Sequence, residues 1–145
     1  MKHLIIFLSA IILPFLTLPV RSETAEETFQ KGFAHYLYEQ YAEAAKCFET
    51  AANQGYANAQ FFLGVVYASG EGVVKDSKKA FVWVEKAANQ KHSRAQLVLG
   101  TMYEKGEGVA KDFEKAKFWY QKAADQEEEG AQEALDSLKI KMQKP

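Results

Sequence analysis

The sequence predicts an all-α protein, a solenoid of antiparallel helix hairpins. About ten positions recur at a constant offset of 36 residues, so that residues 59–90 match residues 95–126. A fixed period of this length is typical of stacked supersecondary units. Within each block the apolar residues are spaced as on one face of a helix, and glycines follow the apolar stretch.

Residues 1–22 are expected to form a cleaved signal peptide. A short positive start precedes an apolar run from Leu4 to Leu13, and two prolines then interrupt any longer helix. Val20 and Ser22 suit a signal peptidase site, which places cleavage before Glu23. Export to the periplasm or the outside of the cell follows. The alternative is an inner-membrane anchor, because Leu4 to Val20 spans 17 residues, near the lower limit for crossing a bilayer.

Residues 25–56 are expected to form a first, shorter hairpin. Gly32 and Ala44 correspond to Gly64 and Ala80, but they are 12 residues apart instead of 16. The missing residues are those of the Gly-Glu-Gly loop. Cys47, the one cysteine of the chain, takes the place of a tryptophan, so this unit should pack differently. It is interpreted as a small core residue, with an intermolecular disulfide or a reactive thiol as the alternative.

Residues 57–92 and 93–128 are each expected to form a full hairpin. The first helix should end near Gly70, because glycine readily takes the left-handed conformation that closes a helix. Asp76 is placed to cap the second helix by accepting from its free first-turn amides. Gly64 and Ala80 are small enough to let the two helices approach closely. The equivalent residues 36 positions later predict the same for the next unit.

Residues 129–145 are expected to form a capping helix and a tail. Leu135, Leu138 and Met142 are spaced to face inward, as in the terminal cap of a solenoid. The preceding run, Glu127 to Glu129, is interpreted as a solvated, helix-starting segment, with a metal site as the weaker alternative.

The recurring pattern Ala-x-x-x-Leu-Gly-x-x-Tyr-x-x-Gly-x-Gly-Val-x-Lys-Asp-x-x-x-Ala-x-x-Trp-x-x-x-Ala-Ala resembles the SEL-one-like repeat (SLR). It occurs at 59–88 and 95–124, and the shorter first unit is more similar to the parent tetratricopeptide repeat. The resemblance covers roughly residues 25–143 and implies a right-handed α-solenoid that acts as an adaptor for other proteins. For exported bacterial members, the resemblance implies a role in envelope assembly or host interaction. Lys91 and Glu127 stand where Gly55 ends the first unit, so the turns between units are expected to be less typical.

By the same resemblance, the first helix of each unit lines a concave groove that binds a protein or peptide partner. An apolar strip at one end would seat an extended or helical segment, and two basic residues at the other end would pair with its acidic groups. The alternative is that these side chains pack between units. The predicted groove residues are Phe29, Phe33, Tyr36, Leu37, Phe61, Val65, Arg94, Leu97, Thr101 and Lys105.

Other chemistry is poorly supported by the sequence. The 18 basic residues are balanced by 19 acidic ones, so no strongly basic surface is available for nucleic acid. The Gly-Glu-Gly loops lack the Gly-Lys-Ser/Thr of a phosphate site. His35 and His92 are isolated from any cysteine or second histidine, which argues against a metal site. No activated nucleophile motif occurs, and no cofactor is expected.

The sequence therefore predicts a non-enzymatic, exported adaptor that is a monomer or a weak homo-oligomer. The alternative is a cell-wall-related or β-lactam-reactive enzyme of the cysteine-rich SLR subgroup. This chain lacks the paired cysteines of that subgroup.

Overall fold

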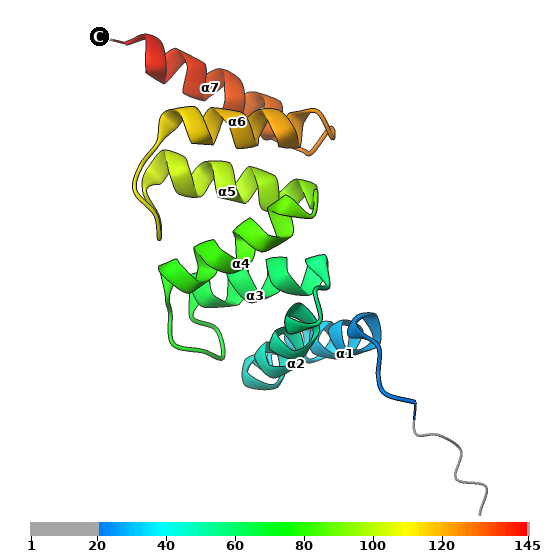
Figure 1. Cartoon of the computed structure of the whole chain (residues 1–145). Helices are drawn as coiled ribbons and strands as arrows, with labels where there is room; N and C mark the ends of the chain where they lie inside the picture. Colours follow the sequence, from blue (N-terminus) through cyan, green and yellow to red (C-terminus); the bar gives the residue numbers. More distant parts are fainter. Residues whose placement is uncertain (1–20, 145) are drawn as a thin grey trace, which may run out of the picture.

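The computed structural model describes residues 21–144, which form seven helices and no strand. Figure 1 shows the helices stacked in succession from α1 at one end to α7 at the other. The predicted signal peptide lies almost entirely outside the described residues. No described helix is both long and apolar enough to cross a bilayer. The helices are α1 (Ala25–Leu37), α2 (Tyr41–Asn53), α3 (Ala57–Ser69), α4 (Ser77–Asn89), α5 (Ser93–Lys105), α6 (Phe113–Ala124) and α7 (Ala131–Gln143).

The helices pair as three antiparallel hairpins with a final single helix. Each helix packs chiefly on its neighbours in sequence, α1 with α2, α3 with α4 and α5 with α6 within hairpins. The helices α2 with α3, α4 with α5 and α6 with α7 form the junctions between them. The all-α solenoid predicted from the 36-residue period is confirmed.

The predicted helix ends are also confirmed. Gly70 and Gly106 close α3 and α5 in the left-handed conformation, with φ of 78° and 73°. The Asp76 and Asp112 carboxylates cap α4 and α6, accepting from the backbone N–H of Lys79 and Lys115 at 3.0 Å. Each cap satisfies one of the amides that a helix leaves free in its first turn.

A glycine lets the two helices of each hairpin approach closely. A Cβ added at Gly64 would lie 2.6 Å from Val84 Cγ2 and 3.2 Å from the Ala80 carbonyl oxygen. At Gly100 it would lie 2.5 Å from the ring of Tyr120. The predicted close approach is therefore present, but the side chain four residues after the small alanine fills the space beside the glycine.

The Gly-Glu-Gly loops have a second role that the sequence did not reveal. A Cβ at Gly72 would collide with the backbone of Tyr41 at the start of α2. A Cβ at Gly108 would collide with the backbone of Ser77 at the start of α4. Each loop thus packs against the second helix of the preceding repeat, and only a residue without a side chain fits there.

The turns between repeats share one backbone conformation. Gly55, Lys91 and Glu127 all have positive φ, at 87°, 66° and 58°. The expectation that the Lys91 and Glu127 turns would depart from the first one is wrong for the backbone. The turn geometry is held by the stacking of the repeats even where the residue is not glycine, at some cost in strain.

Buried glutamines join one repeat to the next. Gln60 donates to the Ala52 carbonyl at 3.3 Å and accepts from Gln90 at 2.7 Å. Gln96 repeats this, donating to the Ala88 carbonyl at 3.2 Å and accepting from Gln126 at 2.7 Å. These bonds satisfy polar groups inside the junctions, which are otherwise lined by apolar side chains.

Candidate functional site

We define the first-helix face as the surface formed by α1, α3 and α5, which carry all the predicted groove residues. Phe29 and Phe61 are only 6% exposed and belong to the core, so they offer almost no surface to a partner. Leu37 and Lys105 are exposed at the last residues of α1 and α5. Arg94 is exposed as well. The half-buried predicted residues are Phe33, Tyr36, Val65, Leu97 and Thr101.

The α1 end of this face is an aromatic cluster. Phe62, which the sequence analysis did not select, lies at its centre. The Phe62 ring centroid is 5.5 Å from those of Phe29, Phe33 and Phe48. The Tyr36 hydroxyl donates to Glu71 at 3.0 Å, which ties α1 to the loop of the second repeat. The packing alternative for Phe29 and Phe33 is thus realised, with part of Phe33 still open to solvent.

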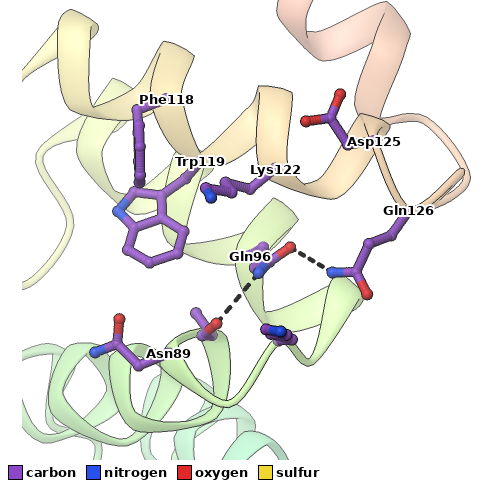
Figure 2. A pocket seen from close by; sticks show the side chains of 9 residues that line it. Asn89, Gln96, Phe118, Trp119, Lys122, Asp125 and Gln126 are labelled. Atoms are coloured by element: carbon purple, nitrogen blue, oxygen red, sulfur yellow. Dashed lines mark hydrogen bonds between the residues drawn. The ribbon is translucent and has the colours of Figure 1, made fainter.

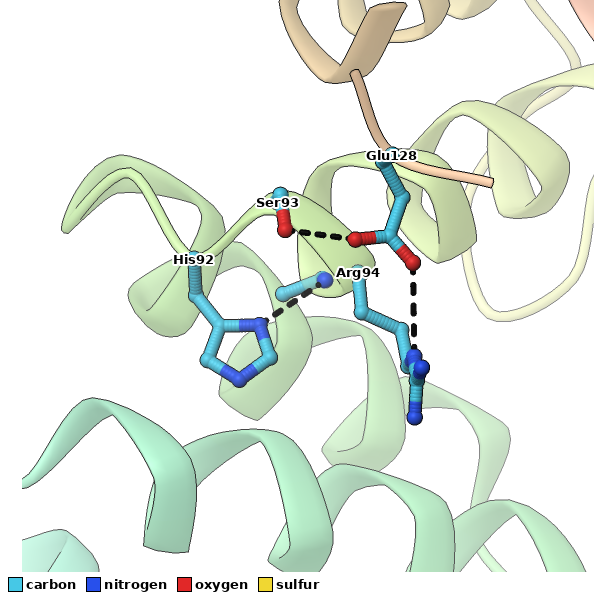
Figure 3. A network of polar contacts seen from close by, with 5 residues as sticks. His92, Ser93, Arg94 and Glu128 are labelled. Atoms are coloured by element: carbon cyan, nitrogen blue, oxygen red, sulfur yellow. Dashed lines mark hydrogen bonds and ion pairs between the residues drawn. The ribbon is translucent and has the colours of Figure 1, made fainter. Parts of the chain in front are cut away.

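A hollow of about 220 Å³ opens farther along the first-helix face. It is lined by Phe61, Phe62, His92, Ser93, Arg94 and Glu128, and we refer to it as the Arg94 hollow. Figure 3 shows Glu128 reaching over the start of α5, where it accepts from Ser93 Oγ at 2.6 Å and from Arg94 Nε at 3.4 Å. The hollow combines an apolar floor with one cation and one anion at its rim.

His92 forms one wall of the Arg94 hollow and also caps α5. Its ring stacks on Phe61 with centroids 4.8 Å apart, and its Nδ1 accepts from the Ala95 N–H at 3.1 Å. The neutral ring must therefore carry its proton on Nε2. Burial lowers the pKa of His92, although the nearby Glu128 carboxylate acts in the opposite direction. Protonation of Nδ1 would remove the acceptor of the cap.

A second polar cluster lies in the third repeat, where Tyr120 donates to Glu104 at 2.6 Å and Lys141 donates to the same carboxylate at 2.6 Å. Burial and the hydrogen bond to Glu104 raise the pKa of Tyr120 to about 12. Burial alone would raise the pKa of Glu104, but the bonds from Lys141 and Tyr120 outweigh it and lower the pKa. Neither group is poised for proton transfer near neutral pH, so the cluster serves to hold α7 on α5 and α6.

Four residues that line the Arg94 hollow were not among the predicted groove residues: Phe62, His92, Ser93 and Glu128. Glu128 was interpreted as part of a solvated acidic run, yet its side chain is only 14% exposed because it turns back onto Ser93 and Arg94. That part of the prediction is wrong. Phe62 lies beside Phe61 in sequence, and helical spacing alone did not show which of the two faces the core. Among residues 21–144, no group of three or more His, Cys, Asp or Glu side chains is arranged to hold a metal.

The fold and this site define a class: a short helical-repeat scaffold with a mixed apolar and charged surface for contacts. The Sel1 repeat model matches residues 29–56, 57–92 and 93–128. The chain therefore belongs to the Sel1 repeat family, whose members generally serve as non-catalytic protein-interaction scaffolds.

Solved structures with the same architecture support this assignment. A Sel1 repeat protein from Oxalobacter formigenes is 39% identical, with a TM-score of 0.72 over 78% of this chain and 88% of that one. A protective antigen of uropathogenic Escherichia coli with an SLR fold is 32% identical, with a TM-score of 0.78 over 81% of this chain. This chain spans only 26% of the length of that antigen.

The cysteine-rich protein B of Helicobacter pylori is similar in fold. It is 24% identical, with a TM-score of 0.58 over 74% of this chain and 95% of that one. No curated protein matches the chain.

Proposed function

We propose that this protein is an exported, non-enzymatic adaptor that binds a protein partner on its first-helix face. The observation that carries the proposal is the Arg94 hollow, in which an apolar floor lies beside a cation whose side chain is 66% exposed. The partner is a peptide segment that places an apolar side chain on Phe62 and an acidic group beside Arg94.

Of the two charges at the rim of the hollow, the Arg94 cation is the exposed one, which favours an acidic segment. Arg94 uses its Nε toward Glu128, and its other guanidinium donors make no hydrogen bond to any described residue. Lys105, at the other end of α5, adds a second exposed cation to the same face. Because the helices that carry these groups are packed into the stack, little ordering is required when the partner binds.

Site-specific photocrosslinking in the native host tests the proposal. A crosslinking residue at Asn58, exposed in the first turn of α3, should yield a protein adduct that mass spectrometry can identify. The same residue at Lys78, exposed in α4, serves as the control and should not. Equal adducts from both positions, or none from Asn58, would contradict the first-helix face as the binding surface.

Arg94→Gln sharpens this test. Glutamine retains a hydrogen-bond donor for Glu128 but removes the charge, so the Asn58 adduct should fall while the helical circular dichroism stays unchanged. Lys78→Gln is the matched control. An undiminished adduct in Arg94→Gln would show that the partner does not use this cation.

Two measurements test the remaining parts of the proposal. Amino-terminal sequencing of the protein from its host should begin at Glu23 if the signal peptide is cleaved as proposed. Incubation with a labelled penicillin should leave the purified chain unlabelled. A stable label would favour the competing β-lactam-reactive enzyme.

A further inference from the structure

A second concavity lies outside the first-helix face, formed mainly by α4 and α6. It has a volume of about 410 Å³, within the range of small-molecule sites, and we refer to it as the Trp119 pocket. Figure 2 shows the Trp119 indole between the Phe118 ring, also on α6, and Asn89 at the end of α4. Phe118 packs edge-on against the Trp119 indole, with centroids 5.1 Å apart and planes at 83°.

Comparison with the preceding repeat shows how the surroundings of the Trp119 indole differ, although both tryptophans are half-buried. Trp83 is the equivalent residue, and the Lys86 ammonium lies over its ring at 4.1 Å from the centroid. In the third repeat Val82 is replaced by Phe118, and Lys122 lies over the Phe118 ring at 5.4 Å instead. Among the described residues no lysine lies over Trp119. Lys122 thus lies over Phe118, whereas its equivalent Lys86 lies over the tryptophan.

The rim of the Trp119 pocket is polar and mostly positive. Lys91 and Lys122 contribute two cations. Asp125 contributes one carboxylate, and its Oδ1 already accepts from Gln121 at 2.8 Å. Asn89 makes no side-chain hydrogen bond among residues 21–144, which leaves its amide free to donate and to accept.

The floor of the pocket is fixed. Gln96 is only 3% exposed, and both ends of its amide are bonded, to Ala88 and to Gln126. The Trp119 pocket therefore has a fixed base and a half-buried indole wall, and its rim carries the Asn89 amide and more positive than negative charge.

We propose that the Trp119 pocket binds a carboxylated sugar, as a unit of an acidic oligosaccharide. One face of a pyranose ring presents C–H groups that pack on an aromatic face, whose electron density attracts them. The hydroxyls at the edge of the ring both donate and accept, as the Asn89 amide does. The carboxylate pairs with Lys91 and Lys122. An apolar peptide side chain would leave these rim groups desolvated and unpaired.

Tryptophan fluorescence tests this proposal directly, because the chain contains only Trp83 and Trp119. In the full chain carrying Trp83→Phe, all indole emission comes from Trp119. Titration with oligogalacturonate should give a saturable change in emission. The neutral probe maltotriose should bind about tenfold more weakly or worse, since it lacks the carboxylates. No saturable change with oligogalacturonate, or equal binding of maltotriose, would overturn the proposal.

Two variants separate binding from folding. Phe118→Val recreates the second repeat, so Lys122 should move over Trp119 and weaken binding by about fivefold or more. Phe118 is 53% exposed, so the fold should tolerate this change. Lys91→Gly removes a cation and places glycine at a residue with positive φ, so it should bind more weakly while the protein becomes more stable.

The remaining outcomes would overturn the proposal. Unchanged oligogalacturonate binding in both variants would place the ligand elsewhere. A tri-glutamate peptide that changes the Trp119 emission as strongly as oligogalacturonate would show that the pocket recognises carboxylates without recognising the sugar.

Discussion

The second and third repeats have the same framework and different surfaces. Their alanines, glycines and capping aspartates coincide at an offset of 36 residues, and the structure uses each pair in the same way. Their second helices differ at several positions, and two of these changes alter local contacts: Val82 and Val84 are replaced by Phe118 and Tyr120. The first change places a ring under Lys122, and the second introduces a hydroxyl that reaches Glu104.

This difference indicates that the repeated positions determine the stack, and that replacements beside them change the groups on its surface. Functional residues in such a chain are best sought at and beside the positions where the 36-residue period fails. The following predictions test this comparison, in order of decreasing expected effect.

Gly100→Ala should destabilise the protein more than Gly64→Ala. The new methyl group would meet the Tyr120 ring at 2.5 Å, and Tyr120 is held in place by Thr101 and Glu104. Overpacking costs about 1–3 kcal/mol, of which the better helix propensity of alanine recovers up to about 1 kcal/mol. Urea unfolding of both variants measures the difference, with the exposed Ser137→Ala as control. A stability equal to that of the parent would show that the two helices of the hairpin can move apart without lowering the free energy of unfolding.

Tyr120→Phe should cost about 1 kcal/mol, because it removes the hydrogen bonds to Glu104 and Thr101 while keeping the ring. It should also reduce the loss of stability at high pH. The pKa of Tyr120 is raised to about 12, so its contribution is complete below pH 10 and is lost as the pH rises toward 12. Thermal unfolding between pH 9 and pH 12 checks both effects. An alkaline profile identical to that of the parent would contradict this role.

Glycine at the later turns should stabilise the protein by up to about 1 kcal/mol per site, because a left-handed conformation is strained for other residues. Lys91→Gly and Glu127→Gly test this, and Gly55→Ala should lose a similar amount. A Cβ at Gly55 meets nothing within 4 Å, so any loss there is a backbone effect. Chemical denaturation of the three variants measures the shifts. A loss of stability in Lys91→Gly would mean that the Lys91 side chain stabilises the fold by more than the strain of its left-handed backbone costs.

His92 should make the junction between the second and third repeats sensitive to acid, unlike the preceding junction, where Tyr56 occupies the equivalent position. The pKa of His92 is lowered by burial, so His92 is protonated at a lower pH in the folded protein than in the unfolded chain. Its contribution is complete above about pH 6.5 and is lost as the pH falls through the lowered folded pKa.

His92→Asn keeps a capping side chain that does not titrate, and the stability should change less between pH 7 and pH 4. Thermal unfolding over this range provides the measurement. An unchanged pH profile would show that the cap does not depend on the charge of the ring.

Most of the fold was predictable because the residues that form the helices and turns recur in successive repeats. The helix ends at Gly70 and Asp76 follow from local chemistry that leaves a mark in the sequence. The packing of Gly72 against the start of α2 was not predictable in this way. It depends on how one repeat is oriented on another, which no local pattern specifies.

The candidate site was predictable only in part. The resemblance to the SLR family pointed to the first helices, and two of the predicted residues, Phe61 and Arg94, line one hollow. Helical spacing did not separate Phe61 from Phe62, because neighbouring residues differ by only about 100° around a helix. Glu128 lies in a run of three identical residues, where no property of the sequence distinguishes the one that folds inward. The sequence does carry one sign of the bonds between repeats. Gln60 and Gln96 recur as polar residues on an otherwise apolar face, which indicates a buried hydrogen bond.

The packing of each Gly-Glu-Gly loop on the preceding repeat means that sequence boundaries and mechanical boundaries do not coincide. The second repeat is completed only when Gly108, beyond its own last residue, settles on the start of α4. During synthesis, the start of the second helix in each hairpin therefore stays exposed until the loop of the next repeat has been made. Cleavage of the chain after residue 92 would therefore leave each fragment with an exposed surface that the other fragment normally covers. We expect the two fragments to associate in solution.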